Sequence, residues 1–354
     1  MGLSSLSLGQ SCIASGEYSF AEGFYTTASG LSSHAEGTNT IASGMHSHAE
    51  GLGSKAVGFL AAHAEGMLTE ASGAYSHSEG YLTIASEQSS HAEGASSHAS
   101  GAISHAEGLY TVASGYCSHA ANMGTIAAGA NQTAIGRYNV PSSSDLDALL
   151  IGRGSFDNYR DNAFRFNFLG QAFGTSWATT GADFSELFEW EDGNVNEEDR
   201  VGFFVTLIDD KIRIINNLSE EVIGVVSSVP SIIGDSEGLA WKNKFIKDDF
   251  GRIEYEWIDT QIEIDKVLGT KLRLKEHVPK LNPNYNIQLE YIPRTDRPEW
   301  SAIGLIGKLI VFDDGTCEVN KYCTANVKGI ATKSDSGYRV LKRISVDKIQ
   351  ILFK

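Results

Sequence analysis

A short acidic and aromatic stretch near the middle of the chain carries the residues best suited to chemistry. Its members are Asp183, Phe184, Glu186, Phe188, Glu189, Trp190 and Glu191. A carboxylate held close to an amide bond can act as general base or general acid in its hydrolysis. A rigid assembly that holds both groups makes this reaction effectively unimolecular. Because residues 178–182 just before the stretch are small, we interpret the region as a flexible hinge between two differently built parts of the chain.

Other kinds of catalytic site have weaker support. His277 is the only histidine outside the repeats described below, and no nucleophile elbow accompanies it as a Ser-His-Asp triad would require. No glycine-rich loop ends in Lys-Ser or Lys-Thr, as a phosphate-binding loop does. A carboxylate pair acting on a sugar cannot be recognised without the separation of its members. We therefore expect no cofactor.

The composition limits the partners of the chain. Its net charge of -16 at pH 7 disfavours nucleic acid, because phosphate neutralisation needs a basic face, and it disfavours anionic membranes. No uncharged apolar segment reaches the roughly 18 residues that span a bilayer, and the first residues do not resemble a signal peptide. The four cysteines are expected to be reduced, although a bond between the last two stays open: Cys12, Cys117, Cys317 and Cys323. We expect a soluble protein made in a cytoplasm.

Internal repeats dominate the first third of the chain. Glycine recurs every seven residues over 9–58 and, after one extra residue near Phe59, over 66–136, with Glu87 and Asn122 replacing two of the glycines. Two kinds of heptad alternate. One reads Ser-His-Ala-Glu-Gly, and the other reads Ile, Val or Thr followed by Ala-Ser-Gly. The repeating unit therefore has fourteen residues.

These repeats predict a β structure. A coiled coil needs large apolar residues at its a and d positions, and the recurring residues here are small. Glycine at every seventh position suits a tight turn with positive φ, and about five residues between turns make one short strand. We predict a narrow parallel β-roll over residues 1–136, about 45 Å long at about 4.8 Å per coil. One such roll buries too little surface alone, so we expect a homotrimer.

The repeat segment resembles the heads of trimeric autotransporter adhesins, which share the pattern of a strand followed by glycine. That resemblance implies that the residues three and one before each glycine point into the roll. Here those positions hold His and Glu in one heptad, and Ile, Val or Thr and Ser in the other. Period-two alternation puts His and Glu on one strand face and the small residues on the other. Whether the His–Glu face is core or solvent stays open.

The recurring histidines allow two interpretations. They are His34, His48, His63, His77, His91 and His105. They could form a metal-binding or pH-sensing ladder, or a stacked His–Glu ladder that satisfies its own polar groups. Stacked glutamates repel one another, and interleaved histidines would relieve that repulsion. We favour the structural ladder and predict no bound metal, because the spacing recurs too regularly for one closed site and no cysteine joins it.

Residues 137–182 are expected to form a short stalk. Two strands are expected at 148–152 and 163–168, and the second alternates aromatic and polar residues, so one of its faces is aromatic. Three intertwined copies would cover that face. Asp157 and Asp161 lie between the strands. Each is read as part of a solvated turn in preference to a source of a catalytic carboxylate.

Residues 183–354 read as a compact, β-rich domain, with a hairpin at 203–208 and 211–215 and a strand at 317–320 among its expected elements. This domain resembles the self-cleaving C-terminal chaperone domain of phage neck-appendage and tail-spike proteins, a glutamic-type autopeptidase of the G2 kind. The matching stretches are residues 181–190, 202–207, 223–230, 234–235, 249–252, 304–307 and 313–317. The whole chain is thus expected to be an all-β fibre with a stalk and a terminal chaperone.

The resemblance also implies where the chain is cut. It puts the scissile bond between Ala182 and Asp183 and makes Glu186 the catalytic carboxylate, assisted by an upstream aspartate. Asp161 or Asp157 is the candidate helper, with Asp161 preferred. Since Ala182 has no hydroxyl for an acyl shift, water activated by a carboxylate is the expected nucleophile. The neighbouring Ser185 hydroxyl has no assigned role.

A uniform repeat needs a device that sets its register, because a slip by one unit pairs equally well. Together with this need, the resemblance implies a phage or prophage tail-fibre or appendage protein of the virion. Its C-terminal domain would align three chains and then sever itself once, leaving a kinetically trapped fibre. The alternative is a trimeric adhesive fibre whose C-terminal domain stays attached and binds a host-cell receptor. A bacterial surface adhesin is disfavoured.

Overall fold

The computed structural model describes residues 2–236, 244–265, 270–286, 288 and 292–354, and the chain divides into two units, Met1–Trp177 and Ala178–Lys354. In the described residues every regular element is a strand, apart from two short 3-10 turns, η1 (Asp157–Tyr159) and η2 (Arg294–Asp296). The predicted all-β class is therefore confirmed. Within the described part of the chain, no helix is long and apolar enough to cross a membrane.

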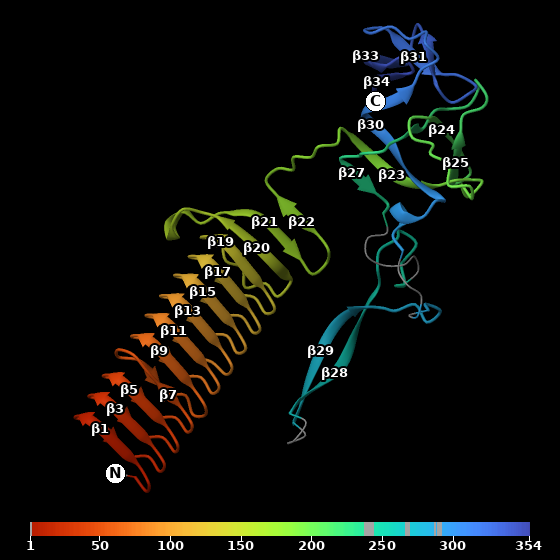
Figure 1. The fold of residues 1–354 in the computed structure, drawn as a ribbon. Coiled ribbons are helices and arrows are strands. Elements are labelled where there is room, and N and C mark those ends of the chain that lie inside the picture. The colour runs from red at the N-terminus through yellow and green to blue at the C-terminus, as the bar shows by residue number, and fades with distance from the viewer. Residues whose placement is uncertain (1, 237–243, 266–269, 287, 289–291) are drawn as a thin grey trace. The chain divides into compact units, whose positions relative to one another are not determined.

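The first unit is a parallel β-solenoid (Figure 1). One face holds β1 (Leu6–Gln10), β3 (Phe20–Phe24), β5 (His34–Thr38), β7 (His48–Ala49), β9 (His63–Met67), β11 (His77–Tyr81), β13 (His91–Ala95), β15 (His105–Leu109), β17 (His119–Met123) and β19 (Thr133–Arg137). The other holds β2 (Ile13–Ala14), β4 (Thr27–Ala28), β6 (Ile41–Ala42), β8 (Lys55–Ala56), β10 (Glu70–Ala71), β12 (Ile84–Ala85), β14 (His98–Ala99), β16 (Val112–Ala113) and β18 (Ile126–Ala127). Each coil contributes one strand to each face, as the sequence predicts.

Strand pairing joins residues fourteen apart, as in Ala21 with Ala35. The step is sixteen in the last parallel pairing, Thr133 with Leu149, and fifteen across the extra residue near Phe59, as in His48 with His63. The loop around that residue takes up the insertion, so the stack of coils continues in register on both sides of it. The fourteen-residue coil predicted from the glycine spacing is confirmed.

The core of the solenoid consists of alanine. The alanines two before each glycine are fully buried on both faces, as at Ala92 and Ala99. The residues three and one before glycine, such as His91 and Glu93, lie on the outer face and are half-buried. The inward orientation that the adhesin resemblance implied for these two positions is therefore wrong. The roll is narrow, and it is the small alanine methyl groups of the two sheets that fill its interior.

The glycines of the two heptads serve different needs. Gly80, after a Glu, has φ +101°, as the predicted turn requires, whereas Gly101 in the other heptad does not have positive φ. At both positions an added Cβ would collide with a backbone carbonyl of the next coil. One kind of glycine is thus needed for both conformation and space, and the other for space alone.

The first unit ends in three further strands of the same sheet, β20 (Asp147–Arg153), β21 (Asn162–Asn167) and β22 (Ala172–Gly174). β20 continues the parallel stack beside β19, and β21 and β22 then pair in antiparallel fashion. Phe164 and Phe166 share one face of β21, with ring centroids 6.5 Å apart, and both remain half-buried. The aromatic face predicted for the stalk therefore exists and is incompletely covered within one chain.

The second unit is built on a mainly antiparallel sheet. Its strands are β23 (Asp183–Glu189), β24 (Phe204–Ile208), β25 (Lys211–Ile214), β26 (Gly224–Val226), β27 (Ile232–Gly234), β30 (Trp300–Phe312), β31 (Tyr322–Ala325), β32 (Ala331–Ser334), β33 (Tyr338–Ser345) and β34 (Lys348–Phe353), and a separate hairpin joins β28 (Tyr255–Asp265) to β29 (Thr270–Pro279). The long strand β30 pairs with β23, β26 and β34. It therefore connects the start of the domain to its core.

The hairpin predicted at 203–215 is confirmed as β24 and β25. The strand predicted at 317–320 is wrong, because this segment forms a turn that buries Cys317. The thiol of Cys317 does not pair with that of Cys323, and both remain free. Burial raises the pKa of Cys323 to about 12, which keeps this thiol protonated and poorly reactive.

Candidate active site

Strand β23 positions the acidic stretch and separates its side chains onto two faces. Asp183, Ser185 and Leu187 are buried on one face, as the period of two along a strand requires. Glu186 is half-buried and alternates with them, so its side chain lies on the opposite face. β23 itself runs between β30, with which it is antiparallel, and β27, with which it is parallel.

The backbone on either side of Asp183 is held by two hydrogen bonds, one to the peptide bond between Ala182 and Asp183 and one to the next peptide bond. The backbone N–H of Lys308 donates a hydrogen bond to the carbonyl oxygen of Ala182 at 3.1 Å, and the N–H of Ser231 donates to the carbonyl of Asp183 at 2.8 Å. Gly307 faces this bond with φ +126°, and a Cβ there would collide with the Ala182 carbonyl oxygen. The backbone around the predicted cut is thus fixed by its neighbours.

The carboxylate of Asp183 is enclosed, since this residue is only 5% exposed. Its Oδ2 accepts a hydrogen bond of 2.7 Å from the Ser185 hydroxyl, and it lies 3.0 Å from the position that a Cβ on Gly304 would take. The sequence analysis assigned no role to the Ser185 hydroxyl and missed this hydrogen bond to Asp183. The signal for it was the i, i+2 spacing within an expected strand, which places both side chains on one face.

Glu186 lies elsewhere on the strand. Its Oε1 is 3.4 Å from the place that a Cβ on Gly234 would occupy, and in the described part of the chain its carboxylate has neither a hydrogen bond nor an ion pair. Three residues of strand separate it from Asp183, roughly 10 Å at the usual rise. Within one chain, therefore, the structure does not bring the Glu186 carboxylate to the Ala182–Asp183 bond.

A cavity of about 290 Å³ adjoins this bond. Thr180, Gly181, Ala182 and Asp183 form one wall, and the rest comes from residues 201–202, 226–229 and 308–312 together with Lys348 and Gln350. A cavity of this size holds several water molecules. The nucleophile that hydrolysis requires therefore has a place next to the peptide.

Asp157 and Asp161 belong to the first unit, and Glu186 belongs to the second. Asp157 lies in η1 and forms an ion pair of 2.5 Å with Arg160. Asp161 pairs with Arg153 at 2.6 Å, and the hydrogen bond from that guanidinium lowers the pKa of the Asp161 carboxyl group. Within the first unit, both of these candidate catalytic carboxylates are exposed, and each forms an ion pair with an arginine.

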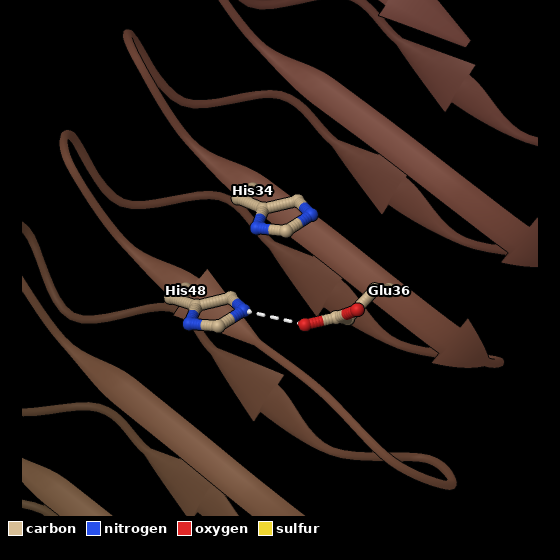
Figure 2. Close-up of side chains that lie close together, drawn as sticks. All are labelled: His34, Glu36 and His48. Atoms are coloured by element: carbon tan, nitrogen blue, oxygen red, sulfur yellow. Dashed lines mark hydrogen bonds and ion pairs between the residues drawn. The ribbon is translucent and has the colours of Figure 1, made fainter. Parts of the chain in front are cut away.

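The histidine ladder lies on the outer face of the solenoid, which answers the question that the sequence left open. Neighbouring rings stack with centroids 4.6–5.0 Å apart from His34 to His119. His119 was missed because its heptad lacks the Glu-Gly pair. Each ring also faces a glutamate of the preceding coil, as Figure 2 shows for His48 and Glu36, whose Nε2 and Oε1 are 3.2 Å apart.

The same geometry places possible metal ligands together, because the ligand atoms of His34, Glu36 and His48 lie within 4.8 Å of one another (Figure 2). Burial and the two flanking rings, His91 and His119, lower the pKa of His105. The neutral form of this imidazole is therefore favoured, and a neutral ring stacks on its neighbours without charge repulsion. Divalent cations bound in adjacent coils would lie about 4.8 Å apart and would repel one another strongly. This repulsion disfavours filling the whole ladder with metal.

We expect protein purified without added metal to contain no stoichiometric zinc or nickel, because hydrogen bonds from the histidines of the next coils already engage Glu36, Glu65 and Glu79. Elemental analysis of the purified chain checks this. The control is the same chain carrying His48→Gln and His77→Gln, which removes ligands from three of the four candidate clusters in the histidine ladder. Zinc in the unchanged chain that is lost from this variant would contradict the structural ladder.

Residues 154–349 match the family described as Peptidase_G2, IMC autoproteolytic cleavage domain. The match covers more than half of the chain, and the chain therefore belongs to this family, as its resemblance predicted. It is also similar to the pre-neck appendage proteins of Bacillus phage B103, at 38% identity over 160 residues, and Bacillus phage phi29, at 35% over 157. These alignments cover 45% and 44% of this chain and 17% of each relative.

A phage-related protein, YobO, of Bacillus subtilis is 32% identical over 162 residues, which is 45% of this chain and 18% of that protein. The chain thus spans less than a fifth of the length of these relatives. The fold resembles the crystal structure of the pre-mature bacteriophage phi29 gene product 12, with a TM-score of 0.51 at 22% identity over 98% of this chain and 39% of that one. That likeness concerns the fold.

Proposed function

We propose that this chain is part of a virion tail fibre or appendage whose C-terminal domain aligns three copies and then cuts itself off in a single turnover. The cut falls between Ala182 and Asp183. The observation that carries this proposal is the setting of that bond: it lies at the first residue of β23, its carbonyl oxygen accepts a backbone hydrogen bond, and it adjoins a cavity. A member of an autoproteolytic family needs such a bond.

The repeat supplies the reason for an aligning domain. Successive coils present the same alanines, glycines and histidine stacks, so a chain displaced by one coil would find nearly the same partners. A globular domain at one end fixes the register before the coils pack. In this proposal residues 1–136 form the fibre, 137–182 the stalk and 183–354 the chaperone.

Exposed apolar side chains support the association of three chains. They follow the Glu-Gly turns, or Asn122 at the equivalent position, on one edge of the solenoid. We call them the apolar edge: Phe24, Tyr25, Leu52, Met67, Leu68, Tyr81, Leu82, Tyr110 and Met123. Each is at least 38% exposed in the single chain. Exposed apolar residues gathered in this way mark a contact with another molecule, and parallel copies of the same chain would cover them. Thr38 and Asn39 in one coil and Ala95 and Ser96 in another interrupt the series.

The chemistry follows from the position of Glu186. Because roughly 10 Å of strand separates it from Asp183, we propose that Glu186 removes the proton from the attacking water at the scissile bond of a neighbouring copy. Asp161 or Asp157 of the stalk assists. Cleavage then requires an assembled trimer, and its rate is first order in trimer.

A denaturing gel of freshly made protein, with N-terminal sequencing of the small fragment and light scattering of the native material, tests the proposal. We expect two fragments, a new terminus reading Asp-Phe-Ser-Glu, and a trimer. A single band at the full 38.1 kDa that persists in a trimer would favour the permanently attached receptor-binding domain. A monomer at micromolar concentration would refute the fibre itself.

Phe166→Asp is expected to block cutting without touching the site, because it places a charge on the aromatic face of β21 that three copies would cover. The control is Asn167→Asp, which adds the same charge on the other face of the same strand. Gel analysis over time measures the cut fraction. Normal processing of Phe166→Asp would show that stalk winding is not required.

A further inference from the structure

We propose that the N–H of Lys308 and the carboxyl group of Asp183 take part in the cut, and that Ser185 is the residue that positions Asp183. The Lys308 N–H stabilises the oxyanion that forms at Ala182. The Asp183 carboxyl group delivers the proton to its own nitrogen, the leaving group. This inference rests on the proposed cleavage between Ala182 and Asp183.

The Lys308 N–H is already in place for an oxyanion. It lies 3.1 Å from the Ala182 carbonyl oxygen, within the range of donors that stabilise a tetrahedral intermediate. Gly307 makes this approach possible, since a Cβ at this position would occupy the space of the carbonyl oxygen. A backbone donor fixed in a sheet does not reorganise during the reaction, and its contribution is therefore retained in the transition state.

The Asp183 carboxyl group is the acidic group closest in the chain to the leaving nitrogen. Only Cα, Cβ and Cγ separate its oxygens from that atom. The side chain is enclosed beside Leu309 and Gly304, and among the described residues Ser185 is its one hydrogen-bond partner. The hydroxyl occupies Oδ2, which leaves Oδ1 available to carry a proton. Ser185 itself is fully buried, so its hydroxyl has a single useful orientation.

Hydrolysis proceeds through a tetrahedral intermediate at the Ala182 carbonyl carbon. The oxygen of water bonds to the Ala182 carbonyl carbon, one water proton passes to Glu186 of a neighbouring copy, and the carbonyl π electrons move to the oxygen facing Lys308. That proton passes through water in the adjoining cavity to the Asp183 carboxylate. When the carbonyl re-forms, the C–N bond breaks with its electron pair on nitrogen, and the Asp183 carboxyl group gives the proton to that nitrogen. One water is consumed, and both carboxylates return to their starting state.

The test measures cutting of newly synthesised full-length chains over time and across pH, with trimer formation checked by light scattering. Asp183→Asn is expected to slow cutting by about 100-fold or more, the usual contribution of a general acid or base. Ser185→Ala is expected to slow it by about tenfold and to shift the pH profile, and Ser185→Thr, which keeps the hydroxyl, is expected to restore both. A merely structural serine would not shift the profile.

Ser301→Ala is the matched control. It removes another hydroxyl from the same pair of strands, one that accepts a hydrogen bond of 2.9 Å from the Trp190 indole, and it is expected to cut normally. Trimeric Asp183→Asn that cuts within twofold of the unchanged chain would overturn the proposal. If Asp183→Asn does not assemble, an unchanged rate and pH profile in Ser185→Ala would overturn it. Failure of the proposed function looks different: the unchanged chain stays whole or is cut at another bond.

Discussion

Glu186→Gln is expected to give trimers that remain full length. The substitution keeps the size of the side chain and removes its ability to take a proton from water. Glu186 has no hydrogen bond or ion pair within the described residues of its own chain and lies over Gly234, so its replacement costs the fold little. The expected effect on cutting is a loss of at least about 100-fold. Gel analysis and light scattering of the same preparation measure cutting and assembly separately.

Glu189→Gln is the matched control for this experiment. Glu189 lies on the same strand and pairs with Lys211 at 2.6 Å, so its replacement removes a charge and an ion pair without reaching the proposed chemistry. We expect it to be cut at the normal rate. Normal processing of Glu186→Gln would remove Glu186 from the mechanism and leave Asp183 as the carboxylate at the bond.

Gly80→Ala is expected to destabilise the solenoid by about 3–5 kcal/mol, because it combines backbone strain with a steric clash. Its φ of +101° is unfavourable for any residue with a Cβ, and that Cβ would meet the carbonyl oxygen of Gly94 in the next coil. Neither atom can move away without breaking the ladder between β11 and β13. The apparent melting temperature by circular dichroism is expected to fall. It is measured in chains that also carry Glu186→Gln, so that every chain in the sample remains uncut.

Gly170→Ala separates the two causes. Gly170 also has positive φ, at +78°, but nothing lies within 4 Å of the Cβ that it would gain. Its cost is therefore backbone strain alone, about 1–2 kcal/mol. Equal losses in the two variants would show that close stacking of the coils adds nothing to the requirement for glycine.

The sequence predicted the solenoid well because its repeat is local. Glycine spacing alone was enough to predict the coil length, the parallel strands and the turns. It did not predict which residues face inward, and the resemblance to adhesin heads pointed to the wrong ones. Alanines such as Ala92 fill the interior, whereas the bulky His91 and Glu93 lie outside. A two-residue period identifies the two faces of a strand but not which of them is buried.

The site could be predicted only in part for a related reason. The resemblance, through a linear motif, predicted roles for Ala182, Asp183 and Glu186, and neighbours in sequence could have indicated the Ser185 contact. Gly307 and Lys308 are more than a hundred residues away, and they reach Ala182 only through the register of β23 on β30. A one-residue bulge shifts that register beside Ser185. No local pattern in the sequence encodes such a pairing.

The alanine-filled solenoid behaves as a chain of interchangeable units whose number is free to change. Each coil contacts only the coils before and after it, so the stability of the stack is close to a sum over units and their junctions. Removing residues 77–90 would join chain ends that already match, since His77 and His91 occupy equivalent positions in adjacent strands. The fibre would shorten by one step of about 4.8 Å without any change in its cross-section. Recombination within the repeat therefore offers a gradual way to adjust how far such a fibre extends.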